Sequence, residues 1–207
     1  MSLETLITFI AASAVLGLAP GPDNIFVLTQ SALYGRKSGI YITLGLCTGL
    51  LLHSSAVALG VAAIFMVSMT AFTVLKLVGA AYLLYLAWGA FKASAVALDE
   101  KALALPDLSA LYRRGIIMNI TNPKVAIFFL AFLPQFARPD AGSMTEQLFL
   151  LGVIFIVVSL VIFTGIACLA GFISSWLKGS IKAQLILNRL AGLIFVGLAL
   201  RLATTTR

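Results

Sequence analysis

Charged side chains are scarce in this sequence. They make up 10% of the 207 residues, whereas hydrophobic residues make up 61%, and the mean hydropathy is +1.10. Because a soluble domain carries about 25% charged residues, this composition excludes a soluble globular protein and predicts that lipid is part of the solvent. A helix needs about 20 apolar residues to cross the hydrocarbon layer, so the chain has room for about six or seven spans and no soluble domain.

Histidine and cysteine are also scarce, with one His and two Cys. Cys47 and Cys168 lie far apart inside apolar runs, which argues against a disulfide framework. One histidine and two cysteines form no ligand cluster, so neither a metal site, metal export nor a cofactor is expected. An intramembrane serine protease would need His53 as its base, but Ser54 and Ser55 adjoin it and point elsewhere on a helix. We therefore expect no catalytic residue and no enzyme.

Acidic residues number only seven against 14 Lys and Arg, which gives a net charge of +7. No basic stripe is present, so nucleic acid is not an expected partner. With the N-terminus outside, the connectors place three basic residues outside and nine inside: Arg36, Lys37, Lys92, Lys101, Arg113, Arg114, Lys178, Lys182 and Arg189. The positive-inside rule thus predicts a multi-pass protein of a bacterial inner membrane with both termini in the periplasm. The first apolar run, from Leu3, has no basic n-region or cleavage site and is interpreted as a retained span.

Six apolar runs are present, at residues 3–34, 39–67, 71–91, 115–136, 148–177 and 184–203. The first is too long for one straight span, since about 32 residues at about 1.5 Å each would measure about 48 Å. Pro20-Gly21-Pro22 interrupts this run, and Asn122-Pro123-Lys124 interrupts the fourth. Proline removes an N–H donor and clashes with the preceding turn, so both helices are predicted to be broken.

The polar connector at residues 94–112 divides the chain into a first repeat, 1–93, and a second repeat, 113–207, with three spans each. An odd number of spans makes the second repeat enter the membrane from the opposite face. The sequence predicts an all-α, polytopic membrane protein in a single transporter domain, with six transmembrane helices in two inverted three-helix repeats. Helices 1 and 4 are discontinuous, an arrangement common in secondary transporters.

The two breaks carry the candidate binding residues. Asp23 and Asn24 follow the first break, where free N–H groups at a helix N-terminus attract an anion such as a substrate carboxylate; the alternative is that Asp23 only caps the helix. Asn119, Asn122 and Lys124 surround the second break. Lys124 could neutralise Asp23 or receive a carboxylate, and the alternative is that its long side chain reaches the headgroups.

Two further groups bear on coupling and packing. Because histidine is the side-chain type that serves in proton relays, His53 is, with Asp23, a candidate proton relay, although a neutral imidazole bonded to a neighbouring helix explains it equally well. Lys76 is expected to reach the membrane interface. Gly45 and Gly49 form a G-x-x-x-G pair, whose ordinary role is close helix packing.

Several motifs resemble the LysE/RhtB family of bacterial amino-acid exporters. They are Pro20-Gly21-Pro22-Asp23-Asn24, the run from Ser31 to Gly39, the run from Gly45 to Gly49 with Leu52-His53, the run from Leu75 to Leu83, Asn119-Ile120-Thr121-Asn122-Pro123-Lys124, and the run from Phe132 to Phe136. The resemblance covers nearly the whole chain. It implies an exporter that expels amino acids or their analogues from the cytoplasm, driven by the proton motive force. Members of the family often carry an uncharged residue where Asp23 stands.

The expected substrate is a neutral amino acid such as threonine, homoserine or leucine. Asp23 is essentially the only acid inside the membrane, and a dicationic substrate would need a carboxylate partner. The substrate site is expected at Pro20, Gly21, Pro22, Asp23, Asn24, Asn119, Asn122, Pro123 and Lys124, and the partners are the substrate, protons and the lipid bilayer. A homodimer is compatible with the sequence, which does not fix the oligomeric state. The alternative function is a transmembrane thiol carrier that uses Cys47 and Cys168.

Overall fold

The computed structural model describes residues 1–61, 69–92, 107–178 and 181–204. These residues are helical and contain no strand, as predicted. Most of the predicted connector 94–112 and the end of the predicted second span lie outside them. The elements are α1 (Leu3–Leu18), α2 (Pro22–Tyr34), α3 (Arg36–Ala56), η1 (Val57–Val61), α5 (Met69–Lys92), α6 (Leu108–Thr121), α7 (Pro123–Ile127), η2 (Phe128–Phe132), η3 (Leu133–Phe136), η4 (Pro139–Ala141), α8 (Met144–Lys178) and α9 (Ile181–Thr204).

Both predicted breaks are confirmed. The α1–α2 pair bends by 59° and the pair formed by α6 and Pro123–Phe136 bends by 50°. Within the described residues, three helices are long and apolar enough to cross a membrane, or up to five spans exist if each bent pair is one span. The predicted third span, 71–91, coincides with the 24-residue α5, which is not among those five, so the count of six spans stays a prediction.

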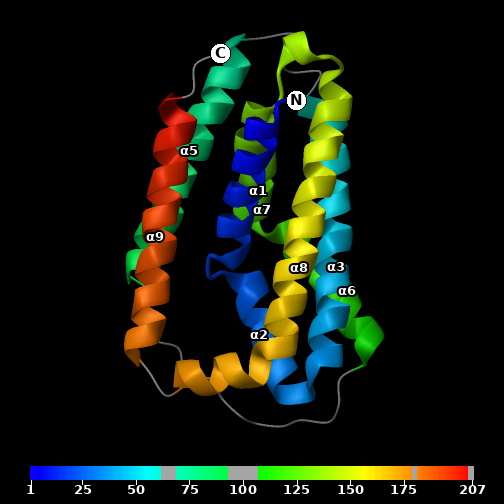
Figure 1. Cartoon of the computed structure of the whole chain (residues 1–207), viewed down its shortest axis with the longest axis vertical. Helices are drawn as coiled ribbons and strands as arrows, with labels where there is room; N and C mark the ends of the chain where they lie inside the picture. The colour runs from blue at the N-terminus through cyan, green and yellow to red at the C-terminus, as the bar shows by residue number, and fades with distance from the viewer. Residues whose placement is uncertain (62–68, 93–106, 179–180, 205–207) are drawn as a thin grey trace.

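The helices run lengthwise in alternating directions (Figure 1). The α1–α2 pair descends from the end that holds the N-terminus, α3 ascends and α5 descends. The α6–α7 pair then ascends from the opposite end, α8 descends and α9 ascends, so that α9 ends at the same end of the molecule as the N-terminus. The two broken elements therefore start from opposite ends of the molecule.

Close helix contacts set the positions of the two breaks. Helix α3 packs along α6, α8 packs along α1 and α2, and α5 packs along α9. A Cβ on Gly45 would lie 2.1 Å from the Tyr112 carbonyl oxygen, and one on Gly115 would lie 2.6 Å from that of Ile42. Glycine at these positions lets α3 and α6 approach until their backbones touch, which confirms the packing role expected for Gly45.

The main core is rich in phenylalanine. Phe128 on η2 contacts the rings of Phe9, Phe132 and Phe155 at centroid distances of 6.3, 5.0 and 4.9 Å. These rings join α1, α8 and the segment after the second break. The core therefore holds the second break firmly between the two halves.

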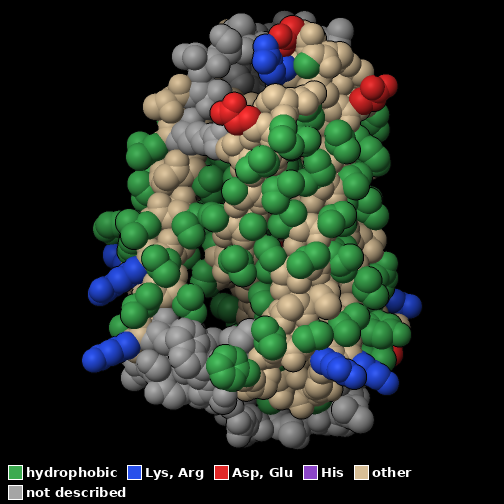
Figure 2. Space-filling model, in the orientation of Figure 1, with side chains coloured by type: hydrophobic (Ala, Val, Ile, Leu, Met, Phe, Trp, Pro, Cys, Tyr) green, Lys and Arg blue, Asp and Glu red, His purple; other side chains and the backbone are tan. Residues whose placement is uncertain are grey.

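Basic side chains gather at one end of the molecule. Figure 2 shows most of the visible Lys and Arg side chains in the lower half, whereas the upper end carries acidic side chains beside a single cluster of basic atoms. Arg138, the N-cap of η4, and Asp140 within η4 form an ion pair with an N–O distance of 2.6 Å. The apolar surface occupies the zone between the two ends.

Candidate functional site

The first break is built from α1 carbonyls that lose their normal partners. Gly21 is the N-cap of α2 and Pro22 is its first residue. Because proline has no N–H, Pro20 and Pro22 cannot donate hydrogen bonds to carbonyls in the last turn of α1. The side chain of Asn24 returns to that turn, and its Nδ2 donates to the Gly17 carbonyl at 2.6 Å. Asn24 thus stabilises the break from within the same half.

The second break has a complete side-chain cap. The Asn122 Oδ1 accepts a hydrogen bond from the Lys124 backbone N–H at 3.0 Å, and Pro123 is the first residue of α7. The Asn119 carbonyl would bond the N–H of residue 123 in a continuous helix, but proline has none. It accepts instead from the Asn122 N–H at 3.1 Å, and His53 Nε2 lies 3.3 Å from it.

Two contacts join the breaks across the halves. Lys124 Nζ donates to the Ala19 carbonyl of the first break at 3.0 Å, and Asn119 Nδ2 donates to Asp23 Oδ2 at 3.4 Å. Lys124, Asp23 and Asn119 are 8%, 3% and 1% exposed. The structure therefore brings the predicted residues Asp23, Asn24, Asn119, Asn122 and Lys124 into one buried cluster. Of the other predicted residues, Pro20 and Gly21 are half-buried, and Pro22 and Pro123 are exposed.

The geometry distinguishes between several sequence-based alternatives. Asp23 does not cap α2, because the N-cap is Gly21 and no side chain caps that end. Lys124 is buried instead of reaching the headgroups. It acts electrostatically on Asp23, but within the described chain the one pair of opposite charges within 4.0 Å is Arg138–Asp140, so Lys124 and Asp23 form no direct ion pair.

His53 lies at the edge of this cluster. Its ring is half-buried and stacks on Phe129 with a centroid distance of 5.6 Å. A carbonyl can only accept, so the contact to the Asn119 oxygen requires a proton on Nε2. His53 thus bonds a neighbouring helix, and through Asn119 it is linked to Asp23.

The cluster contains unpaired polar atoms. In the described part of the chain, the buried side-chain atoms without a hydrogen-bond partner are Asp23 Oδ1, Asn24 Oδ1, Asn119 Oδ1, Asn122 Nδ2 and Ser31 Oγ. Four of these five belong to the two breaks. Because a buried polar group without a partner is costly, their concentration indicates a place where a polar ligand or water binds.

Two cavities meet at Lys124. A small one of about 20 Å³ is lined by Asp23, Asn24 and Asn119, among others. A larger one of about 550 Å³ lies on the other side, and Figure 2 shows a hollow beside α9. It is lined by Pro20, Gly21, Pro22, Ile25, Tyr82, Tyr85, Leu86, Trp88, Gly89, Ala90, Asn122, Pro123, Lys124, Asn188, Ala191 and Phe195.

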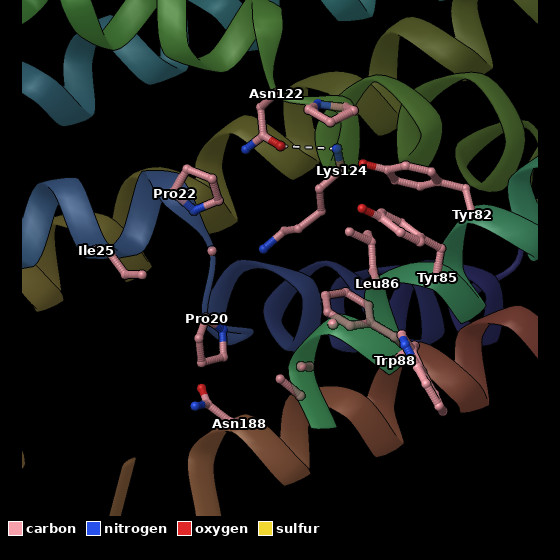
Figure 3. Close-up of a pocket in the computed structure, with 16 residues that line it drawn as sticks. Pro20, Pro22, Ile25, Tyr82, Tyr85, Leu86, Trp88, Asn122, Lys124 and Asn188 are labelled. Atoms are coloured by element: carbon pink, nitrogen blue, oxygen red, sulfur yellow. Dashed lines mark hydrogen bonds between the residues drawn. The ribbon is translucent and has the colours of Figure 1, made fainter. Parts of the chain in front are cut away.

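Figure 3 shows how the larger cavity is arranged. The Lys124 side chain extends toward the segment between Pro20 and Pro22, and Tyr82 and Tyr85 face the same space from α5. A Cβ on Gly21 would lie 3.2 Å from Lys124 Nζ. Sequence reasoning missed the α5 and α9 walls, although the three-residue spacing of Tyr82, Tyr85 and Trp88 was a signal that these aromatic residues share one helix face.

Comparison with known proteins identifies the family. The family model described as LysE type translocator matches residues 14–206. The chain belongs to the LysE-type translocator family. It is also 36% identical over 197 residues to a homoserine/homoserine lactone efflux protein of Salmonella typhimurium, covering 95% of this chain and 94% of that protein. An uncharacterised membrane protein of Bacillus subtilis, YrhP, is 29% identical over 96% of this chain and 98% of its own. No solved structure matches.

Membership confirms the resemblance predicted from the proline motifs. This translocator is a membrane protein that transports a small molecule and is not an enzyme. Both of its cysteines are free, with Cys47 buried and Cys168 exposed. Within the described residues they form no disulfide, so the geometry gives no support to the thiol-carrier alternative.

Proposed function

We propose that this translocator exports amino acids or their analogues from the cytoplasm by alternating access. The observation that carries the proposal is the meeting of two broken helices, through the Lys124–Ala19 bond, beside unpaired buried polar atoms and a cavity. Broken helices in membranes occur where they line a cavity or an ion site, because exposed backbone groups are not tolerated in lipid. The name of the Salmonella relative supports an amino-acid-like substrate.

The repeat 1–93, the connector 94–112 and the repeat 113–207 form the proposed inverted architecture. The opposite starting ends of the two broken elements support it, as does the helix packing, in which α3 contacts α6 much as α8 contacts α1 and α2. The basic end is proposed to face the cytoplasm of a cell with an inner membrane, with both termini periplasmic. Six spans satisfy this arrangement.

The larger cavity faces the end of the molecule from which we propose that substrate enters. Its α5 wall runs from Tyr82 to Ala90, close to Lys92 at the basic end of the helix, and its α9 wall begins at Asn188. Tyr85 and Trp88 are 67% and 60% exposed, whereas Lys124 and Phe195 are buried. A cavity exposed toward the basic end and closed at the breaks is what an inward-facing exporter requires.

The substrate carboxylate is proposed to bind between Lys124 Nζ and the start of α2. One Nζ hydrogen points to Ala19, which leaves two donors. Gly21 lies against Nζ without a side chain in the way, and the N-terminus of α2 adds its positive dipole end. The site then consists of Pro20 to Asn24 and of Asn119, Asn122, Pro123 and Lys124.

Proton coupling is proposed to pass through Asp23 or His53. Asp23 is a buried carboxyl group with one oxygen unpaired, and His53 is joined to it through Asn119. A proton on Asp23 would leave the nearby Lys124 without its opposite charge, which gives a means of linking proton binding to the occupancy of the carboxylate site.

The test is export from right-side-out vesicles or cells that hold radiolabelled threonine, homoserine or leucine. We expect faster loss of label with the protein than with a vector control, and acceleration by an inward proton gradient. If the export rate does not change with the proton gradient, proton coupling is refuted, but amino-acid export is not. Equal loss of all three labels in protein and control would refute amino-acid export for these substrates.

A further inference from the structure

We infer that the preferred substrates are amino-acid derivatives with a free carboxylate, a blocked amine and an apolar group, of which N-acyl amino acids are the simplest. The inference rests on the proposed function and defines the substrate class of the same cavity. It follows from the charges, the wall chemistry and the size of the larger cavity.

The charge at the buried end favours a monoanion. Among the described residues that line the cavity, Lys124 is the one charged residue, and none is Asp or Glu. Asp23 lines the small cavity behind Lys124 instead. A free amino acid that brings its carboxylate to Lys124 would find no carboxylate on the described walls of the larger cavity for its ammonium group, whereas acylation removes that positive charge.

The mouth of the cavity carries the same sign. Lys92 Nζ lies over the ring of the lining residue Trp88, 4.4 Å from its centroid. Arg189, on α9, follows the lining residue Asn188 and is exposed. Positive groups at both the entrance and the buried end raise the local concentration of anions and disfavour cations.

The walls and the volume favour an apolar group beyond the carboxylate. Tyr82, Tyr85 and Leu86 on α5 and Phe195 on α9 present rings and aliphatic surface to the cavity. Tyr82 and Tyr85 have their ring centroids 5.8 Å apart. A volume of about 550 Å³ lies within the range of about 300–1,000 Å³ that is typical of small-molecule sites, which are lined mostly by hydrophobic and aromatic side chains.

The experiment compares three ligands that share one side chain. N-acetyl-leucine is an anion, leucine a zwitterion and leucinamide a cation at neutral pH. With the full chain in proteoliposomes, we expect half-saturation of transport at a concentration at least tenfold lower for N-acetyl-leucine than for leucine, and no transport of leucinamide. N-acetyl-glycine should need at least tenfold more than N-acetyl-leucine, because it lacks the apolar side chain.

Charge variants assign the preference to the cavity. Lys124→Gln should reduce the preference for N-acetyl-leucine over leucine to less than threefold. Lys92→Gln, at the exposed mouth, should raise the half-saturation concentration of N-acetyl-leucine about threefold without affecting that of leucine. Lys37→Gln removes the same charge from an exposed position at the same end of the molecule, outside the cavity, and should change neither value.

The outcomes separate this inference from the proposed function. Transport of leucine without transport of N-acetyl-leucine, or an equal preference for both, would overturn the inference and leave amino-acid export standing. Absence of transport for every ligand would overturn both. If Lys124→Gln does not reach the membrane, the Lys92→Gln variant tests the inference by itself. An unchanged half-saturation concentration for N-acetyl-leucine in Lys92→Gln would contradict the role of the basic mouth.

Discussion

Replacing Gly49 with alanine tests whether close helix packing positions the site. Gly49 on α3 faces Asn119 on α6, the residue that contacts both His53 and Asp23. A Cβ on Gly49 would lie 2.7 Å from both Cβ and Oδ1 of Asn119, and 3.0 Å from its Cγ. Because the Asn119 Cβ is fixed to the backbone, rotation of the side chain cannot relieve the contact.

The structure sets the size of the effect. Ordinary contacts begin at 3.4 Å, so Asn119 must retreat by about 0.7 Å, and overpacking of this kind costs about 1–3 kcal/mol. The bond from Asn119 to Asp23 is already 3.4 Å long and would break. A hydrogen bond to a charged group contributes about 1.5–3 kcal/mol, and about 1.4 kcal/mol is a factor of ten. We expect Gly49→Ala to slow export about tenfold or more.

The assay is efflux from preloaded cells, normalised to the amount of protein in the membrane, with thermal stability followed in detergent. Gly165→Ala is the matched control, because a Cβ on Gly165 of α8 meets nothing within 4 Å. It should export at the wild-type rate. Wild-type export by Gly49→Ala would refute the reasoning, since it would show that the contact between α3 and α6 does not position Asn119.

Three further predictions follow from individual contacts. In His53→Gln, the new amide can still donate to the Asn119 carbonyl, so the export rate should stay within about twofold of wild type. If His53 is the proton relay, export by this variant should no longer depend on pH. If the pH dependence of export is unchanged, the relay is assigned to Asp23. The double variant Cys47→Ser and Cys168→Ser should retain at least half of the export rate, and complete loss would revive the thiol-carrier hypothesis. Hydrogen bonds from Ser109 hold the pKa of Asp107, the N-cap of α6, below its usual range. The stabilisation by this cap is therefore complete above the unfolded pKa of about 3.9 and is lost as the pH falls through the lower folded pKa. We expect amide exchange in the first turn of α6 to become faster at low pH in the wild type, and this pH effect to be absent in Asp107→Ala.

The sequence predicted the breaks because their cause is local. Proline at positions 22 and 123 removes an N–H and fixes φ wherever it stands, so the interruption of each apolar run could be located within a few residues. The helix ends were less predictable. The fourth run was expected to begin at Gly115, but α6 begins at Leu108, because the cap by Asp107 and packing along α3 extend the helix into polar sequence.

The partners of the freed carbonyls could not be predicted from the sequence. That Lys124 would bond the Ala19 carbonyl depends on how the two breaks pack against each other. The partners predicted for Lys124 from the sequence were Asp23, a substrate carboxylate or the headgroups. The walls formed by α5 and α9 were missed for the same reason. Their residues are separated from both breaks by many positions and carry no charge that would distinguish them from lipid-facing aromatic residues.

The arrangement of the breaks gives Lys124 a structural role and, in the proposed mechanism, a role in transport as well. A buried ammonium group is costly in a membrane. Lys124 nevertheless satisfies one donor on the carbonyl of Ala19, the C-cap residue with which α1 ends, and it lies near Asp23. Its remaining donors face a cavity in which a carboxylate would complete the set. In the proposed mechanism, the bond from Lys124 to Ala19 competes with the substrate or accommodates it. Occupancy of the cavity and the relative position of the two breaks would then be coupled through a single side chain.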